Sequence, residues 1–479
     1  MSMVSRPPGL DLRRSLRVAL GNASSVLVED AALRQERTID AILSRLYAED
    51  ANKKREMVLL ADEVGLGKTF VALGVAWAVL QQRSDAGLAT GPVVVVTPHS
   101  HALFNKWKRE AERFLKLVAP KDKQFEIKAV SAPHELARAL RLRRPTLVIA
   151  RMPAFSGRIH ERRTADLAVL HTLFHMDDFH LSLDERMALV SDKPEFASRD
   201  ELDLRNSTTA WEAAAQNLDL GFNAGHVRSA FSRLLQLDPS LRLRLQETWT
   251  RIRTRRPRRS GFWEDIREIG RSALGQSVPH GLPLVIVDEI HNWKNHPQSW
   301  WRFLHMLGLR TERLLGLSAT PFQLGPYELI QVLKLRRCLN LPDGRMRFLD
   351  ERISELDRDL QTAGAAGEEL RKAWEAVSFN DLKDIKDAWS RTGITPPADS
   401  LPPRLERAVL TARGVQSAHL RLTDSLRPFL LRHRRDVSHR HGGSAKNPPP
   451  TFPSPVPAEA HFDGVQVWIF AATPNSSTT

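Results

Sequence analysis

Short, continuous runs of apolar residues recur along the chain and predict buried strands. Each run is five or six residues long and lacks the alternation of apolar and polar positions that a strand with one face in water shows. Strands of a parallel sheet are covered by helices on both faces, so such runs are typical of α/β proteins. The five runs are Met57–Ala61, Pro92–Thr97, Thr146–Ala150, Leu282–Val287 and Arg313–Ser318.

Two helices are predicted between the first three of these strands. Phe70–Arg83 is apolar and rich in alanine, whereas Leu103–Leu115 has one apolar and one polar face. Strands that alternate with helices are typical of a doubly wound domain, whose ligand binds at the carboxyl ends of the strands. The pattern therefore predicts an α/β lobe with its functional residues in the loops that follow the strands.

Two long stretches rich in Leu, Ala, Arg and Glu predict helical additions to this lobe. One separates the third and fourth strands by about 130 residues, too many for a simple crossover. The other follows the fifth strand and contains predicted breaks at Thr362–Gly367 and Thr395–Pro403. The expected organisation is an N-terminal segment (1–32), the α/β lobe (33–155 and 281–342), a basic helical insertion (156–280), a helical extension (343–440) and a disordered Pro/Ser-rich tail (441–479).

The stretch MVLLADEVGLGKT has the character of a phosphate-binding loop, because strand, glycine-containing loop and helix follow in the required order. Gly65 and Gly67 allow backbone N–H groups to turn toward phosphate oxygens, and the N-terminus of the next helix favours an anion. Lys68 is expected to bind the β- and γ-phosphates, and the Thr69 hydroxyl to ligate magnesium. Asp62 replaces the first glycine of the general pattern. The alternative is a chance glycine turn that caps an ordinary helix.

Two carboxylates, Asp288 and Glu289, leave the end of the fourth predicted strand. At the sheet edge that holds the phosphate loop, Asp288 would hold magnesium through water, and Glu289 would orient and deprotonate the attacking water. A helix N-cap is the structural alternative. After the fifth strand, Ser318, Ala319 and Thr320 could hydrogen-bond the carboxylates and report the state of the phosphates, although alone they would indicate only a turn.

Composition favours a polyanionic partner. The formal net charge is +14 and the pI is near 10.2, values typical of nucleic-acid-binding proteins, although a general preference for arginine would also produce them. A single cysteine, Cys338, excludes an internal disulfide framework and a cysteine-cluster metal site. No apolar stretch approaches the length of a membrane span, and the first residues lack a secretory apolar region. We therefore expect a cytoplasmic protein without membrane contact.

Four segments in order resemble the superfamily-two helicases, specifically the Swi/Snf-like DNA translocases: LLADEVGLGKT, VVVVTPHSHALFNKWKREAERF, LVIVDEIHNWKN and LLGLSATPFQLGPYEL. The upstream segment LRQERTIDAIL resembles the adenine-recognition element of this family, although an amphipathic surface helix would have the same pattern. LRPFLLRHRRDV resembles the segment before the second motor lobe. The resemblance covers roughly Leu33–Phe155 and Leu282–Val437. It implies a RecA-like P-loop NTPase lobe that binds ATP with magnesium and moves along double-stranded DNA.

The resemblance also assigns roles to individual residues. Those implied to bind nucleotide are Gln35, Asp62, Glu63, Gly65, Leu66, Gly67, Lys68 and Thr69, with Asp62 part of the family signature. Those implied to couple the nucleotide site to the rest of the motor are His291, Ser318, Ala319 and Thr320. Those implied to contact the DNA backbone are Pro98, His99 and Arg151.

A second arginine cluster lies in the predicted insertion, between Trp249 and Trp263. Guanidinium groups flanked by aromatic rings suit contacts with nucleic acid. The alternative is a solvated helix followed by a loop at Pro257, with both tryptophans packed inward. The cluster consists of Arg251, Arg253, Arg255, Arg256, Arg258 and Arg259.

The motor family requires a second RecA-like lobe that supplies arginines to the γ-phosphate, and no Q-x-x-G-R-x-x-R pattern is present. We therefore expect a truncated or frameshifted product, or a split motor whose second lobe is a separate chain. The predicted function is an ATP-binding, DNA-dependent ATPase lobe. The alternative is a non-hydrolysing ATP-binding DNA adaptor. An unrelated P-loop ATPase is disfavoured by DEIH followed by SATP.

Overall fold

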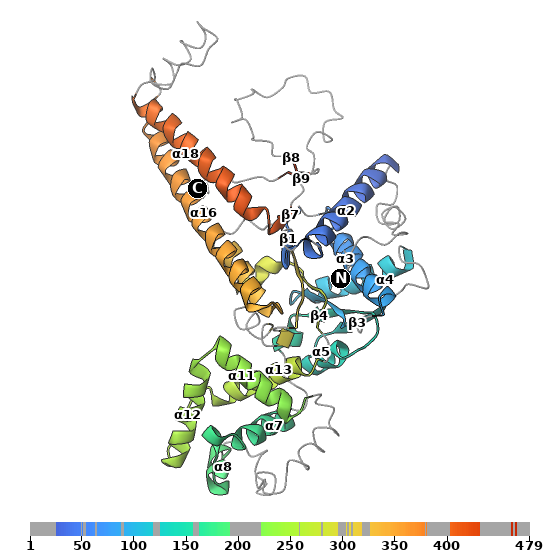
Figure 1. Ribbon diagram of the computed structural model, residues 1–479, viewed down its shortest axis with the longest axis vertical. Helices are drawn as coiled ribbons and strands as arrows, with labels where there is room; N and C mark the ends of the chain where they lie inside the picture. Colours follow the sequence, from blue (N-terminus) through green and yellow to red (C-terminus); the bar gives the residue numbers. More distant parts are fainter. Residues whose placement is uncertain are drawn as a thin grey trace. The chain divides into compact units, whose positions relative to one another are not determined.

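The chain contains two compact units, each described separately below (Figure 1). The first comprises Met1–Met57, Gly67–Leu317 and Lys334–Leu341, and the second comprises Val58–Leu66, Ser318–Leu333 and Pro342–Thr479. A computed structural model describes residues 25–48, 50, 54–62, 65–87, 91–117, 125–156, 162–191, 222–257, 259–278, 281–295, 303, 306–307, 310–318, 326–378, 380, 403–431, 461–462 and 465–466.

Seven strands form an all-parallel sheet in the order β3-β4-β2-β5-β6-β1-β7. They are β1 (Met57–Leu60), β2 (Val93–Thr97), β3 (Glu126–Val130), β4 (Thr146–Arg151), β5 (Val285–Val287), β6 (Leu314–Leu317) and β7 (Leu430–Leu431). With the helices that connect and extend them, they confirm the predicted RecA-like α/β lobe with a helical insertion and a helical C-terminal extension.

All five predicted strands are present, with ends shifted by one to three residues. The largest shift is at β5, which begins at Val285 because Leu282 makes only an isolated bridge, to Thr311. Two strands of this seven-stranded sheet were not predicted. β3 is an edge strand with the mixed sequence EIKAV and four of its five residues partly or fully exposed, so it lacks a continuous apolar run. β7 has two residues, too few to produce a pattern.

Helices of the first unit pack around the nucleotide-loop helix α3 (Lys68–Asp85). This helix is buried over most of its surface because both α2 (Ser25–Leu46) and α4 (His101–Leu117) pack against it. α4 buries only Trp107 and three further residues spaced for one face of a helix, as its amphipathic sequence predicts. The remaining short elements of this unit are α5 (Pro133–Leu140), α6 (Pro153–Ser156) and the 3₁₀ helices η4 (Ile290–Asn295) and η5 (Lys334–Cys338).

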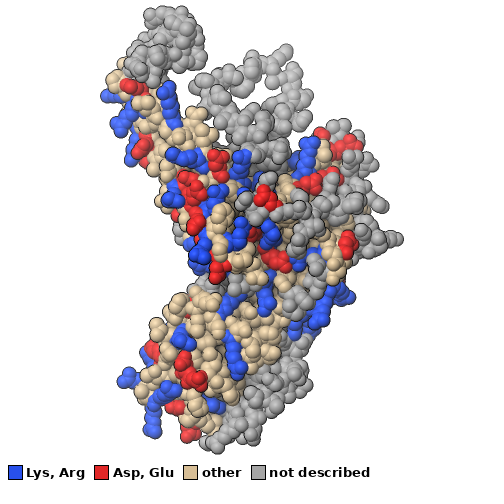
Figure 2. All heavy atoms as spheres, in the orientation of Figure 1, with Lys and Arg blue, Asp and Glu red and all other residues tan. Residues whose placement is uncertain are grey.

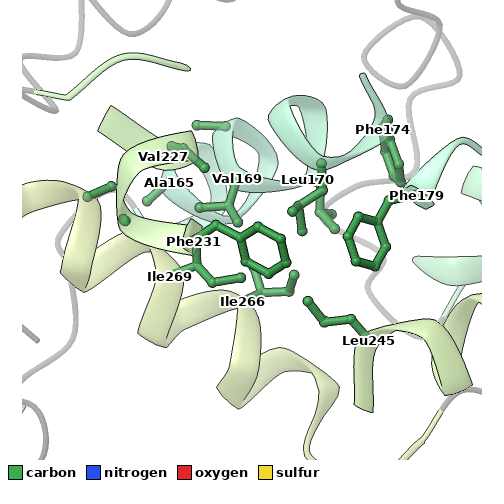
Figure 3. Packing of buried hydrophobic residues seen from close by; sticks show 14 of the residues in the cluster. Ala165, Val169, Leu170, Phe174, Phe179, Val227, Phe231, Leu245, Ile266 and Ile269 are labelled. Atoms are coloured by element: carbon green, nitrogen blue, oxygen red, sulfur yellow. The ribbon is translucent and has the colours of Figure 1, made fainter. Parts of the chain in front are cut away.

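Between β4 and β5 the described elements are all helical and share a hydrophobic core of their own. In this core the Phe179 ring packs against the rings of Phe231 and Trp249, and the Trp249 ring also packs against that of Phe262. Trp249 donates its indole N–H to the Phe179 carbonyl oxygen at 2.6 Å. Figure 3 shows Phe179 and Phe231 among the aliphatic side chains of this core. The elements are α7 (Arg162–Phe174), η2 (Asp177–Phe179), α8 (Leu183–Leu189), α11 (Ala224–Leu237), α12 (Ser240–Arg253) and α13 (Phe262–Gln276). The predicted boundaries at 156 and 280 remain a proposal.

A half-buried carboxyl on α13 gives the insertion a testable pH dependence. Burial, reinforced by the charge of Asp265, raises the pKa of Glu268 from 4.5 to about 6. The folded state then holds its proton more tightly than the unfolded chain, so stability falls as pH rises from about 4.5 to about 6. Glu268→Gln should therefore stabilise the protein by about 1 kcal/mol at pH 7.5 and leave it unchanged at pH 4.

Thermal unfolding at the two pH values measures this difference. Glu247→Gln is the control, because it removes an exposed ion pair with Arg251 and should change stability by less than about 0.5 kcal/mol at pH 7.5. Equal stabilisation of the Glu268→Gln variant at both pH values would show that charge is not the cause.

The second unit contains a pair of long helices, α16 (Asp343–Glu375) and α18 (Pro403–Leu426), that pack along each other (Figure 1). The predicted break at Thr362–Gly367 is wrong: α16 continues through it for 33 residues. Packing against α18 offsets the roughly 1 kcal/mol that each glycine costs a helix. The other predicted break, Thr395–Pro403, lies outside the described residues except for its last residue. That residue, Pro403, is the first residue of α18.

The other described parts of the second unit are short. α15 (Pro326–Leu333) packs against α16. β1 pairs with β7, with Leu59 opposite Leu430 and Leu60 opposite Leu431. In the tail, β8 (His461–Phe462) and β9 (Val465–Gln466) pair antiparallel, and its other residues lie outside the described part. Among the described residues, no helix is both long and apolar enough to span a membrane.

Candidate nucleotide site

The loop after β1 has the backbone that a phosphate-binding loop needs. Gly65 and Gly67 have φ angles of 85° and 87°, in the left-handed region that a residue with a Cβ resists. Gly67 is the N-cap of α3, so Lys68 and Thr69 form the first turn of an 18-residue helix. Unbonded N–H groups at a helix N-terminus favour an anion there. The predicted strand, loop and helix are therefore present.

Gln35 lies against this loop. It is 2% exposed, on α2, and a Cβ added to Gly67 would lie 2.0 Å from its Nε2. α2 is an amphipathic helix, and Gln35 lies on its buried face. The structure thus brings the residue predicted to recognise adenine next to the loop predicted to bind phosphate.

Gly67→Ala should weaken ATP binding at least about 10-fold, because the methyl group displaces the end of the Gln35 side chain and strains the loop. Gly87→Ala is a matched control, since Gly87 also has a positive φ, of 61°, but has open space around its Cβ position. Both changes should cost about 1 kcal/mol of stability from backbone strain. Titration with a fluorescent ATP analogue should separate them; equal affinities in the two variants would contradict this placement of Gln35.

The carboxylate of Asp288 is buried and held at both oxygens. Asp288 follows β5 and is 9% exposed. Its Oδ2 accepts a hydrogen bond from Trp107 Nε1 at 2.7 Å, and its Oδ1 accepts one from the Glu289 amide at 3.0 Å. Burial raises the pKa of Asp288 to about 6, while the hydrogen bond from Trp107 and the charge of Lys68 act to lower it. The two hydrogen bonds therefore fix the orientation of this buried carboxylate.

Glu289 occupies a tight turn, not the N-terminus of an α-helix. Its φ of 44° is unusual for a residue with a side chain, and the next residues form the 3₁₀ helix η4. Its Oε2 lies 3.4 Å from Nδ1 of His291. Such strain is retained where the surrounding structure enforces it, often at functional sites. The helix-cap alternative for Asp288 and Glu289 is therefore disfavoured.

In the second unit, Asp62, Leu66 and Ser318 are buried. The Ser318 amide donates to the Leu60 carbonyl oxygen at 3.0 Å, which extends the pairing at the end of β1 by one residue. This contact places Ser318 beside the strand that leads into the phosphate loop. Three predicted site residues lie outside the described part of the chain: Glu63, Ala319 and Thr320.

The residues available for a metal fit magnesium. Thr69 supplies a hydroxyl and Asp288 a carboxylate, both hard oxygen ligands. Among the described residues there is no group of three or more His, Cys, Asp and Glu side chains that could hold a metal ion alone. Magnesium typically binds through one or two protein oxygens together with water and substrate phosphates. This small donor set is therefore the expected one for a magnesium–nucleotide complex.

The residues predicted to contact the DNA backbone lie where β2 and β4 end. Arg151 is opposite Thr97 in the register of these two strands, and the Arg151 guanidinium contacts the His101 ring at the start of α4. His99 is exposed, whereas Pro98 is buried. In a parallel sheet these ends share one edge with Asp288 at the end of β5.

The arginine cluster of the insertion is only partly available to a partner. Arg253, Arg255 and Arg256 are exposed, and Nη2 of Arg253 donates to the His180 carbonyl oxygen at 2.7 Å. Trp249 and Trp263 are 1% and 8% exposed, so they pack inward and cannot stack on bases. Figure 2 shows basic and acidic side chains interspersed over much of the face in view. Contact with nucleic acid at these arginines remains a prediction.

The contact of Trp107 with the site was not predicted, although Trp107 belongs to the segment after β2 that resembles the motor family. Its place in the apolar face of α4 explains its burial and gives no sign of a polar partner. The indole N–H, however, reaches Asp288, which is 181 positions away in sequence. Only the packing of α4 against the sheet creates this contact.

The parallel sheet, the left-handed glycine loop and the carboxylate turn define a RecA-like P-loop lobe. Residues 31–197 match the family of the type III restriction enzyme, res subunit, whose domain is a helicase-type P-loop ATPase domain of superfamily two. The match includes Gln35 and the phosphate loop and ends before Asp288. No curated protein matches the chain.

Proposed function

We propose that the chain is the ATP-binding, DNA-dependent ATPase lobe of a Swi/Snf-like translocase. The observation that carries the proposal is that Lys68, the first residue of α3, and the buried Asp288 carboxylate each follow a strand of one parallel sheet. One residue comes from the loop that would bind phosphates, and the other from the turn that would hold their metal. A P-loop lobe of the helicase type requires both at one site.

In the proposed reaction, water attacks the γ-phosphorus of ATP, the bond to the ADP oxygen breaks, and Glu289 accepts the proton from the water. Lys68 and the N–H groups at the start of α3 would stabilise negative charge on the phosphates. Gln35 would hold the adenine. Thr69 and Asp288 would hold magnesium, whose positive charge would offset the negative charge of the phosphates. His291 and Ser318 would report the state of the phosphates to the rest of the motor.

Double-stranded DNA is the proposed partner. The formal charge of +14 supports it, as do Arg151 and His99 at the sheet edge of Asp288. Contacts to phosphates position a protein without reading sequence, which suits movement along DNA. We further propose that a second RecA-like lobe, such as one on a separate chain, supplies arginines that accelerate hydrolysis.

ATP turnover measured with and without duplex DNA tests the function. Turnover that DNA stimulates, and that is lost in Glu289→Gln, supports the ATPase. Tight ATP binding without turnover under either condition would support the alternative, a non-hydrolysing ATP-binding DNA adaptor. DNA binding should weaken steeply as salt rises, because each phosphate contact releases counterions.

A further inference from the structure

α4 contacts three parts of the first unit that the proposed function assigns to different tasks. At its first residue, His101 contacts Arg151 at the end of β4. In its middle, Trp107 donates a hydrogen bond to Asp288. Further along, the Phe114 ring packs near the Phe70 ring on α3, the helix that follows the phosphate loop. The centroids of these two rings are 6.4 Å apart. One helix of 17 residues thus connects a DNA-contact residue, the metal carboxylate and the nucleotide helix.

The hydrogen bond from Trp107 fixes the orientation of the Asp288 carboxylate. Trp107 is 2% exposed, so its ring is held by packing and its N–H has a single orientation. The 2.7 Å distance is that of a strong hydrogen bond to a charged acceptor. With the Glu289 amide on the other oxygen, the carboxylate cannot rotate without losing a bond in a buried site. A displacement of α4 would therefore move the carboxylate.

Resting on the function proposed above, we propose that Trp107 is a positioning residue that holds the Asp288 carboxylate in place for magnesium. Through α4 it links this carboxylate to the DNA-contact end of the helix at His101 and Arg151. DNA bound at that end would shift α4 toward the position in which the carboxylate accepts the metal. The affinity for magnesium–nucleotide and the affinity for DNA are then coupled, and by linkage the coupling acts in both directions.

The test is the magnesium concentration that half-saturates binding of a fluorescent ATP analogue, with and without duplex DNA. Trp107→Phe keeps most of the ring volume and removes the donor. It should raise the half-saturating magnesium concentration about 10-fold, while metal-free binding of the analogue stays unchanged. Duplex DNA should lower this concentration in the wild-type protein and have little effect on it in the Trp107→Phe variant.

Trp249→Phe is the matched control. Trp249 is also buried and also donates its indole N–H, but to a backbone carbonyl in the insertion core. This variant should lose similar stability and keep the wild-type magnesium requirement. If Trp107→Phe does not fold, replacement of Trp107 by β-(3-benzothienyl)alanine keeps the size of the indole and removes its N–H, and the magnesium requirement of that protein gives the same information.

An unchanged magnesium requirement in Trp107→Phe would overturn the positioning role. A DNA effect equal in wild type and variant, or absent from the wild type, would overturn the link through α4. If the proposed function itself is wrong, the result differs from both of these. The wild-type protein would then bind no nucleotide at any magnesium concentration, and the positioning role would be overturned as well.

Discussion

Lys68→Ala should abolish magnesium–ATP binding and leave salt-sensitive DNA binding nearly intact. Lys68 is the first residue of α3, directly after the left-handed Gly67. The variant removes the one side-chain charge that the loop directs at the phosphates, so we expect a loss of at least 100-fold in ATP affinity, about 3 kcal/mol. Titration with a fluorescent ATP analogue and with labelled duplex DNA measures the two affinities separately.

Lys116→Ala is the control for this variant. Lys116 is an exposed lysine in the last turn of α4, so its removal subtracts the same charge away from the loop. ATP affinity should stay within about twofold of wild type in the control. If Lys68→Ala lost DNA binding and ATP binding to the same extent, the two ligands would not have the separate sites assigned to them.

The central strands of the sheet could be predicted because both of their faces are covered. Val93–Thr97 and Thr146–Arg151 are buried at nearly every position, and burial leaves a continuous apolar run in the sequence. At the edge of the sheet this rule fails, since Glu126–Val130 needs fewer apolar residues. A continuous apolar run therefore indicates that both faces of a strand are buried. Its absence does not show that no strand is present.

The same limit explains the wrong break in α16. Helix propensity acts locally, and two glycines within a few residues predict an end. α18, which begins 28 residues after α16 ends, supplies the packing that keeps the helix continuous. Tertiary contacts between segments far apart in sequence therefore decide this element.

In the candidate site, the residues that directly follow strands could be predicted from their positions in the sequence. Lys68 and Asp288 follow β1 and β5, and a parallel sheet brings such positions to one edge. Contacts that depend on how a helix packs could not be predicted in this way. The hydrogen bond of Trp107 to Asp288 and the approach of Gln35 to Gly67 both depend on the orientation of a helix against the sheet. Sequence motifs located the chemistry, and helix packing supplied the parts that orient it.

Glu289→Gln should lower ATP turnover by a factor of about 10² to 10⁴, the usual contribution of a general base, and retain magnesium–ATP binding. Glutamine has the shape of glutamate, so the tight turn at residue 289, with its φ of 44°, should persist. The hydrogen bond from the backbone amide of residue 289 to Oδ1 of Asp288 should also persist. Asp288 and Lys68 are unchanged, which leaves the groups proposed to bind the nucleotide in place. Initial rates with saturating duplex DNA, and analogue binding under the same conditions, measure the two effects.

Glu112→Gln, at an exposed position of α4, makes the same chemical change outside the site and should keep wild-type turnover. Loss of turnover together with loss of nucleotide affinity in Glu289→Gln would indicate a disturbed site and not a missing base. A wild-type rate in Glu289→Gln would remove Glu289 from the mechanism. Because the turn forces Glu289 into an unfavourable backbone conformation close to His291, such a result would require that this strain serve a purpose other than proton transfer.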